Sequence, residues 1–372
     1  MPPTRCTHEH PRRRTSHNDQ AERFGNIPRR HLLRGMLVTA AAALVPNGLM
    51  RAQTAPGDAG RIDFHHHFAS PRWLAKQQET KSQGWQPFQG WTPAKSLNAM
   101  DKAGVSTALI SCTAPGPQFP GMSLEETRSM TRDLNEYGAK MASDYKGRFG
   151  LLATLYPLDV DNSLKEIEYA LGTLKAVGFG LITSYGNKWM GDQAYQPVFD
   201  ELNRRKALVF LHPTAAPCCQ NLIPNIPPPV VEYNTDTSRA IANILINGSA
   251  DRTLDVHYVF SHAGGTAPYL VQRLGIAPAP KLADALAGTP APGSRLYHLR
   301  RFYYDVAQST NPIQIQALKL FAGMSQIVFG ADFPYTTIAD HVEALQKCGL
   351  SADELKAIDR GNALRLVPQY RT

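Results

Sequence analysis

Short apolar stretches recur along the chain after residue 60, and longer stretches with helical periodicity separate them. The short stretches are rich in Val, Ile, Leu and aromatic residues, which is typical of strands buried on both faces of a parallel sheet. Between them, residues 124–146 and 163–178 place apolar side chains along one helical face. Eight strands are expected, over residues 61–68, 106–113, 149–157, 178–185, 207–213, 256–265, 302–307 and 326–335.

Strands that alternate with helices predict an α/β fold with right-handed crossovers, and eight of them predict a TIM-type (β/α)8 barrel. The chain has 372 residues, of which 43% are hydrophobic and 19% are charged, and this globular composition accommodates one such barrel plus additional segments. We expect the barrel to occupy residues 56–372. The Pro- and Gly-rich segments at 115–121, 217–229 and 277–282 are interpreted as loops at the active-site end of the barrel.

The first 55 residues differ in composition from the rest of the chain. They contain nine arginines, no lysine and three acidic residues, so they hold +6 of the formal net charge of +8. The Arg29–Arg30 pair precedes a modestly apolar stretch, Met36–Met50, which small and polar residues follow. This order is typical of a signal peptide, and the paired arginines resemble a twin-arginine export signal. We therefore expect residues 1–55 to direct the protein to the periplasm or out of the cell.

Two other interpretations of this leader stay open. A start codon misassigned upstream of Met36 would leave the protein in the cytoplasm, and the segment could also be an amphipathic tail of no consequence. The apolar stretch is too short and too rich in Ala to span a bilayer stably, so no membrane association is expected after removal of the leader. Residues 56–372 carry only +2, and this balance gives no reason to expect a nucleic-acid partner.

Side chains that commonly bind metals follow four of the eight expected strands. Alternate side chains of a strand share a face, so His65 and His67 can both point into the barrel mouth while His66 faces the helices. Further candidates end the fifth, sixth and eighth strands, namely His212, His262 and Asp332. All strand carboxyl ends of a barrel converge on one face, so these residues should meet there. The competing interpretation, that independent polar residues cap buried strands, requires a coincidence at four strands of eight.

The residue types at these positions predict a metal site. Three imidazoles and one carboxylate suit a single divalent ion, and Zn²⁺ fits such ligands best, with Mn²⁺ as an alternative. A second ion would need a bridging acid or a carboxylated lysine on the fourth strand. Residues 178–185 contain no lysine, and Lys188 falls beyond the strand. A mononuclear site is therefore expected.

Together, these motifs resemble the amidohydrolase superfamily, in which an HxH pair ends the first strand and HP, SHAGG and GADFPY follow later ones. Within it, the chain is similar to the branch named after 2-amino-3-carboxymuconate 6-semialdehyde decarboxylase, also in the stretches RFGLLATLYP, FDELNRRKALVFLHP and GNALRLV. The segments IDFHHHF, MDKAGVSTALISCTAPG and LNEYGAKM most resemble 6-methylsalicylate decarboxylases. The resemblance covers about residues 61–367 and implies the metal-dependent hydrolase fold.

The resemblance also implies a role for each candidate residue. The metal ligands that it implies are His65, His67, His212 and Asp332. It makes His262 the general base or acid beside the metal, which agrees with the suitability of imidazole for proton transfer near neutral pH. Arg273 matches an arginine that reaches the neighbouring subunit's site in a homodimer. The alternative for Arg273 is an ordinary solvated charge on a helix.

One departure from the family pattern concerns the substrate. Family members carry an arginine just before a tryptophan in the first loop, where it binds a substrate carboxylate. Residues 86–93 keep Trp91 but contain no arginine, so we expect a smaller, more aromatic acid than the muconate semialdehyde. Aromatic loop residues are candidates to line the pocket, although ordinary packing would explain each of them equally well: Trp91, Phe119, Trp189 and Tyr335.

Three functions are compatible with these residues. The leading hypothesis is a metal-dependent, non-oxidative decarboxylase (a carboxy-lyase) of a small hydroxylated aromatic or unsaturated carboxylic acid, with a proton delivered from Asp332 or through His262. The alternative is a hydrolase of a lactone, ester or amide that uses a metal-bound hydroxide with His262 as base. A third is a catalytically silent, exported metal- or ligand-binding protein, against which the complete ligand set argues.

Overall fold

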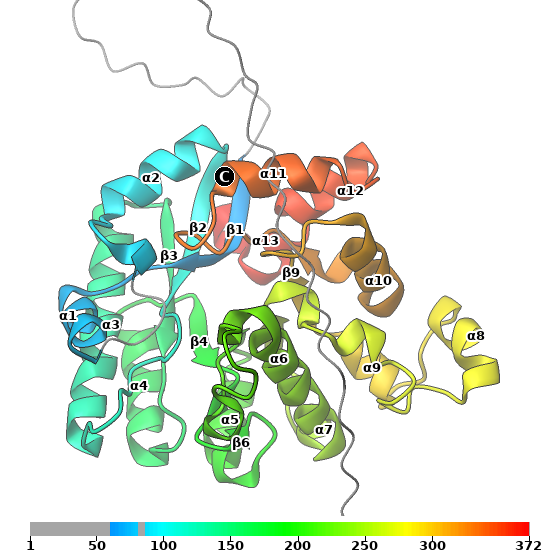
Figure 1. Ribbon diagram of the computed structural model, residues 1–372, viewed down its shortest axis with the longest axis horizontal. Coiled ribbons are helices and arrows are strands. Elements are labelled where there is room, and N and C mark those ends of the chain that lie inside the picture. Colours follow the sequence, from blue (N-terminus) through cyan, green and yellow to red (C-terminus); the bar gives the residue numbers. More distant parts are fainter. Residues whose placement is uncertain (1–59, 81–85, 372) are drawn as a thin grey trace, which may run out of the picture. The chain divides into compact units, whose positions relative to one another are not determined.

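The eight apolar stretches form one parallel barrel in the computed structural model, which describes residues 60–80 and 86–371. The strands follow one another around the barrel in chain order (Figure 1). Closure comes from the chain that follows the last strand, because the Phe64 amide donates to the Phe329 carbonyl at 2.9 Å and the His67 amide to the Phe333 carbonyl at 2.8 Å. The expected TIM-type (β/α)8 barrel is therefore confirmed.

The barrel strands are β1 (Arg61–His67), β2 (Val105–Ser111), β3 (Phe149–Thr154), β4 (Gly178–Ile182), β7 (Leu208–His212), β8 (His257–Phe260), β9 (Tyr303–Asp305) and β10 (Ile327–Val328). A small antiparallel hairpin outside the barrel joins β5 (Ser184–Tyr185) to β6 (Lys188–Trp189). Lys188 thus lies beyond the fourth barrel strand, as expected, and its ammonium pairs with Asp192 at 3.3 Å.

Helices follow the strands and surround the barrel (Figure 1). They are α1 (Pro71–Thr80), α2 (Pro93–Lys102), α3 (Leu124–Asp144), α4 (Val160–Gly172), α5 (Gln196–Arg204), α6 (Pro228–Ile246), α7 (Ser249–Arg252), α8 (Leu282–Ala287), α9 (Arg295–Leu299), α10 (Pro312–Ala322), α11 (Ile338–Gln346), α12 (Ala352–Lys356) and α13 (Ala363–Leu366). None of the helices in the described part of the chain has the length and apolar character needed to cross a membrane.

The two helices expected from periodicity are both present, with shifted ends. A capping box between Ser123 and Glu126 begins α3 where the pattern predicts it. Helix α4 begins before the predicted residue 163, because the Asp159 side chain accepts from the Asn162 amide at 3.3 Å. It also ends earlier than predicted, and the chain passes through a positive φ of 56° at Lys175 before it enters β4.

A layer of buried apolar side chains fills the inside of the barrel and supports the site at its mouth. It includes Ile62 and Phe64 of β1 and Phe210 of β7, and Ala363 and Val367 pack against it from the carboxyl-terminal part of the chain. The loops interpreted as active-site segments, 115–121, 217–229 and 277–282, follow β2, β7 and β8. They thus belong to the face where strand carboxyl ends converge.

The predicted leader lies outside the described residues, including Arg29–Arg30 and the apolar stretch 36–50. Export by the twin-arginine route and the division at residue 55 therefore stay predictions.

Candidate metal centre

The paired histidines of β1 lie at the barrel mouth because the strand is irregular. Its pairing with β2 shifts register between Asp63 and His66. Phe64 belongs to the barrel interior, yet the next residue, His65, also turns inward. The His65 ring packs edge-on against Phe210, with ring centroids 5.1 Å apart. His66 turns outward, where its Nε2 lies 3.0 Å from the Ser96 hydroxyl of α2. The expected orientation of the three histidines is confirmed.

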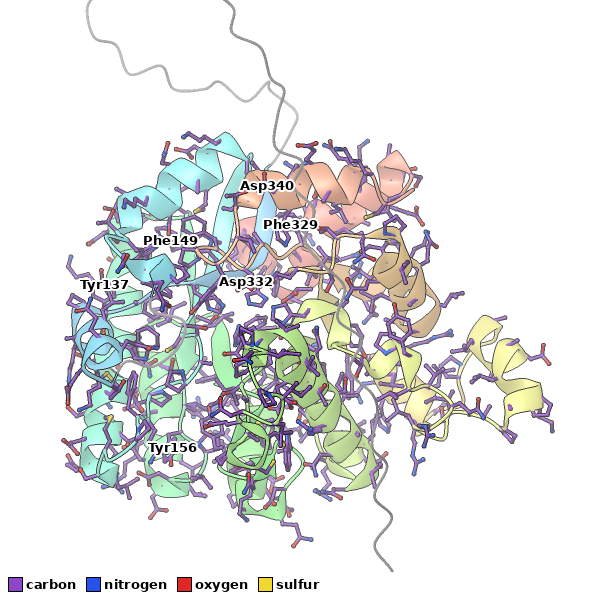
Figure 2. All side chains as sticks on the ribbon, viewed as in Figure 1. Tyr137, Phe149, Tyr156, Phe329, Asp332 and Asp340 are labelled. Carbon is purple, nitrogen blue, oxygen red and sulfur yellow. The ribbon has the colours of Figure 1, made fainter. Side chains whose placement is uncertain are left out.

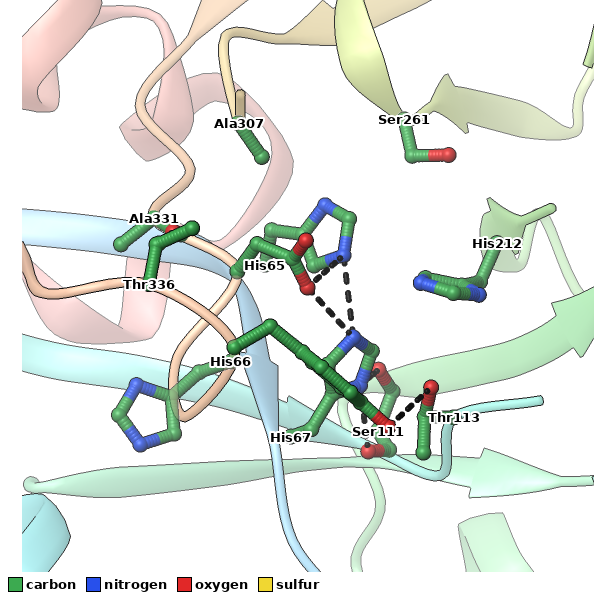
Figure 3. Close-up of polar contacts among 12 residues, drawn as sticks. His65, His66, His67, Ser111, Thr113, His212, Ser261, Ala307, Ala331 and Thr336 are labelled. Atoms are coloured by element: carbon green, nitrogen blue, oxygen red, sulfur yellow. Dashed lines mark hydrogen bonds and ion pairs between the residues drawn. The ribbon is translucent and has the colours of Figure 1, made fainter. Parts of the chain in front are cut away.

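All five residues expected at the mouth meet there. Ligand atoms of His65, His212, His262 and Asp332 lie within 4.8 Å of one another, and all four residues are buried. The Nε2 atoms of His65 and His67 are 3.1 Å apart (Figure 3). Each of them also lies close to Asp332 Oδ1, at 3.2 and 3.1 Å. His262 Nε2 approaches the other oxygen of Asp332, Oδ2, at 3.5 Å.

Two of these residues are held in the left-handed region of the backbone. His262 has a φ of 52° and Asp332 a φ of 62°, which non-glycine residues seldom adopt. Such strain costs roughly 1–3 kcal/mol for each residue and persists only where the surroundings enforce it. Here the His262 amide donates to Asp305 Oδ1 at 2.9 Å, and the Asp332 amide donates to the His65 carbonyl at 2.7 Å. These bonds fix both side chains at the centre of the mouth.

The hydrogen bonds around the histidine rings fix which nitrogen faces the centre. The Nδ1 atoms of His65, His67 and His212 lie 2.8, 3.2 and 2.8 Å from acceptors, which are Asp305 Oδ2, the Ser111 carbonyl and the Pro213 carbonyl. Each Nδ1 therefore carries the hydrogen in the neutral ring, and each Nε2 presents a lone pair. Metal-ligating histidines almost always have such a partner on the second nitrogen.

This set of donors fits a divalent cation. Asp332 Oδ1 is buried and has no hydrogen-bond donor in the described chain, while two Nε2 lone pairs approach it within 3.2 Å. A buried carboxylate oxygen that faces only acceptors is unstable unless a positive charge lies between them. Imidazole nitrogen together with carboxylate oxygen is a donor set typical of Zn²⁺ and also suits Mn²⁺.

In the apoenzyme, a proton on His65 supplies the positive charge that the Asp332 carboxylate needs. Burial opposes protonation of His65, but the carboxylates of Asp305 and Asp332 outweigh it and raise its pKa to about 10. Burial lowers the pKa of His67 and places that of His212 well below its usual range, so both rings stay neutral. Burial would raise the pKa of Asp332, but His65 and His262 hold it well below its usual range.

Comparison with known families agrees with this geometry. The family described as Amidohydrolase matches residues 62–369. The chain belongs to the amidohydrolase family. Two fungal relatives of this amidohydrolase are the decarboxylase yanB of Aspergillus niger and the 6-methylsalicylic acid decarboxylase of Penicillium expansum. They are 36% and 33% identical over 84% of this chain, which corresponds to 88% and 97% of their own lengths. The resemblance predicted from the motifs is confirmed.

A solved structure gives the same fold at lower identity. A dihydroxybenzoic acid decarboxylase from a Polaromonas species, solved with bound manganese and the inhibitor 2-nitroresorcinol, superposes with a TM-score of 0.71. It is 19% identical, and the match covers 84% of this chain and 98% of that one. The (β/α)8 architecture of this amidohydrolase is thus shared with a known decarboxylase.

Sequence reasoning missed Asp305, an acid at the end of the three-residue strand β9. It is fully buried, and besides its contact with His65 it accepts from the amides of His262 and Ala307, both at 2.9 Å. Asp305 thus orients the ring of His65 and the backbone of His262. The available signal was an acidic residue at the carboxyl end of an otherwise apolar strand.

We expect Asp305→Asn to lower the affinity of the amidohydrolase for a divalent cation by roughly 10- to 100-fold. The asparagine oxygen would remain with the two backbone amides, so its NH₂ group would face His65 Nδ1 and favour the tautomer with hydrogen on Nε2. The measurement is competitive titration with a metal-sensitive dye. Asp251→Asn is the matched control, because Asp251 pairs with His298 Nε2, also at 2.8 Å, outside this site. Equal affinities of Asp305→Asn and wild type would contradict the orienting role.

Two further site residues carried no recognisable signal in the sequence. Gln308, whose φ is 48°, donates from its side-chain amide to Asp332 Oδ2, and its backbone amide donates to His341 Nε2 at 2.7 Å. Tyr233 of α6 packs edge-on against His212, with ring centroids 6.1 Å apart. Burial and the nearby Asp332 carboxylate raise the pKa of Tyr233 to about 12, so its phenol stays protonated.

Of the three predicted substrate-binding residues, one lies beside the five site residues and two do not contact them. The Tyr335 ring packs edge-on against His67, with ring centroids 5.6 Å apart, and its hydroxyl lies 3.4 Å from the Thr113 hydroxyl. Trp91 is buried behind His66, where its indole N–H donates to Ser96 at 3.1 Å. Arg273 is exposed and makes no hydrogen bond or ion pair with any described residue. The structure thus brings Tyr335 to the metal centre, but it shows no contact of Trp91 or Arg273 with the five residues there.

Proposed function

We propose that this amidohydrolase is a metal-dependent, non-oxidative decarboxylase of a small hydroxylated aromatic carboxylic acid. The observation that carries the proposal is the complete, buried set of five site residues. The chain matches decarboxylases over nearly their whole lengths, which supports the same conclusion. One of these relatives is a 6-methylsalicylic acid decarboxylase, which supports an ortho-hydroxylated benzoate as the class of substrate.

Four side chains would hold the cation, and Zn²⁺ is the ion that we propose, with Mn²⁺ as the alternative. They are His65, His67, His212 and Asp332, the last through Oδ1. When bound, a divalent ion supplies a positive charge that orients the carboxylate and the ortho oxygen of the acid and stabilises negative charge. The manganese in the Polaromonas structure supports a divalent ion, and the choice between the two ions rests on metal analysis.

His262 and Asp332 are positioned to transfer the proton that the reaction consumes. A proton is added to the ring carbon that bears the carboxylate; the bond between this carbon and the carboxylate then breaks, its electron pair returns to the ring system, and CO₂ leaves. Asp332 Oδ2 does not face the His65 and His67 nitrogens, and it lies 3.5 Å from His262 Nε2. A proton can therefore pass between His262 and Asp332 Oδ2 and from there to the ring carbon.

The surroundings of the site favour an aromatic substrate. The Tyr335 ring stands beside His67 and the Tyr233 ring beside His212, so aromatic surfaces flank the ligand residues on two sides. Residues 86–93 contain no arginine, so this stretch supplies no cation for a second carboxylate of the substrate. A planar monocarboxylic acid matches these groups better than an extended dicarboxylic acid.

The test is CO₂ release from a panel of ortho-hydroxybenzoates, with 6-methylsalicylate and 2,6-dihydroxybenzoate among them, by the metal-loaded chain that lacks residues 1–55. We expect at least one acid to give stoichiometric CO₂ and the corresponding phenol. The matched arm uses aryl lactones and esters of the same acids. Hydrolysis of these compounds with no CO₂ from any acid would refute the decarboxylase and favour the hydrolase alternative.

A further inference from the structure

Helix α6 is fixed tightly against the loop that carries His262. Gly265 of this loop, at a φ of 64°, lies so close to α6 that a Cβ there would be 2.1 Å from the Asn234 carbonyl oxygen. The Ser238 hydroxyl also accepts from the Thr266 amide at 2.8 Å. Only glycine permits this approach, so the second glycine of the SHAGG motif sets the position of α6 next to the metal centre.

A second attachment holds α6 on its other side. The buried carboxylate of Asp236 accepts from the Thr183 and Ser184 hydroxyls at 2.5 and 2.9 Å and from the Trp189 indole at 2.6 Å. These donors belong to the chain that follows β4, whose last residue is paired in register with His212. Tyr233, which precedes Asp236 by three residues on α6, is therefore held in place by the fold before any ligand binds.

The hydroxyl of Tyr233 has no hydrogen-bond partner in the part of the chain that the structure describes. Its oxygen is partly accessible to solvent. The Tyr233 ring stands edge-on to His212, and burial and the nearby Asp332 carboxylate both raise the pKa of its phenol. The hydroxyls of Tyr185 and Tyr335, in contrast, are bonded to the Leu155 carbonyl and to Thr113. A half-buried, unpaired phenol beside a metal centre is available to a ligand.

We propose that Tyr233 donates its hydroxyl hydrogen to the ring oxygen of the bound hydroxylated acid, and that it thereby selects ortho-hydroxy acids. This inference rests on the proposed function. Once the ring carbon that bears the carboxylate has been protonated, cleavage of the ring–carboxylate bond restores the aromatic ring, and negative charge moves from the carboxylate to the ortho oxygen. A donor fixed at that oxygen stabilises the transition state more than the bound acid. A donor at the carboxylate would have the opposite effect, because the carboxylate loses its charge.

The test compares Tyr233→Phe with wild type and with Tyr269→Phe, a control that removes an exposed hydroxyl on the segment following His262. Tyr233→Phe keeps the ring, so its thermal unfolding should match that of wild type. We expect kcat/KM for an ortho-hydroxybenzoate to fall about 10- to 100-fold, mostly through kcat, as for a hydrogen bond to a charged group. Unchanged kcat and KM in an enzyme that releases CO₂ would overturn the inference while the proposed function stands.

A binding measurement makes the test independent of turnover. Calorimetry with the metal-loaded enzyme uses 3-methylphenol, which offers only a ring oxygen, and benzoate, which offers only a carboxylate. Tyr233→Phe should weaken binding of 3-methylphenol about 3- to 10-fold and leave benzoate unchanged. Weaker binding of benzoate alone would assign the hydroxyl to the carboxylate and overturn the ring-oxygen contact. Unchanged binding of both probes would overturn any contact of Tyr233 with the ligand.

Discussion

Asp332→Asn is expected to lower kcat for decarboxylation at least about 10³-fold, the combined effect of losing a proton-transfer group and a charged ligand. The carboxylate performs two tasks with its two oxygens. Oδ1 faces the Nε2 atoms of His65 and His67, and Oδ2 accepts from Gln308 and approaches His262. An amide has one acceptor and no charge. If its oxygen faces the cation, its NH₂ group meets the donating amide of Gln308, and no proton can be held on that side.

The measurement is steady-state CO₂ release at saturating metal, with the bound metal quantified in each sample. Asp340→Asn is the matched control: Asp340 is an exposed carboxylate in the first turn of α11, whereas Asp332 lies among the side chains at the centre of the molecule (Figure 2). The control should keep wild-type kcat. If Asp332→Asn binds its metal fully and stays within tenfold of wild-type kcat, Asp332 takes no part in proton transfer.

The strand pattern was sufficient to predict the barrel and the meeting of five site residues. Parallel strands buried on both faces leave continuous apolar runs, and the barrel brings every polar residue that ends such a run to one face. His212, His262 and Asp332 each end or follow such a run, so their convergence follows from the fold alone. The same pattern could not reveal the register shift in β1, by which Phe64 and His65 both turn inward.

Residues outside this rule were missed for identifiable reasons. Asp305 ends a strand of only three residues, and its importance comes from two partners on other segments, the His65 ring and the His262 amide. Tyr233 lies on a helix, and its position depends on the close approach that Gly265 permits more than 30 positions away in the chain. Gln308 reaches Asp332 from a positive φ that its sequence does not indicate. Tertiary contacts, and not local pattern, place all three.

Removal of the metal is expected to abolish decarboxylation, with kcat reduced at least about 10³-fold, since a bound ion contributes several kcal/mol of charge stabilisation. Exhaustive chelation followed by metal analysis gives the apoenzyme, and addition of Zn²⁺ or Mn²⁺ in separate samples should restore activity. Circular dichroism controls for unfolding. Undiminished CO₂ release from a sample shown to be free of metal would refute every metal-dependent mechanism for this fold.

The affinity of the apoenzyme for a divalent cation is expected to depend on pH. His65, with its pKa raised to about 10 by Asp305 and Asp332 against the effect of burial, carries a proton at pH 7, while His67 and His212 are neutral because burial lowers their pKa. A cation must displace the His65 proton, so binding should release about one proton at pH 7, and affinity should rise about tenfold per pH unit. Above pH 10 the ring is already neutral, so the release should vanish. Calorimetry in buffers of different ionisation enthalpy measures the number of protons, and binding without proton release would show that His65 is not a ligand.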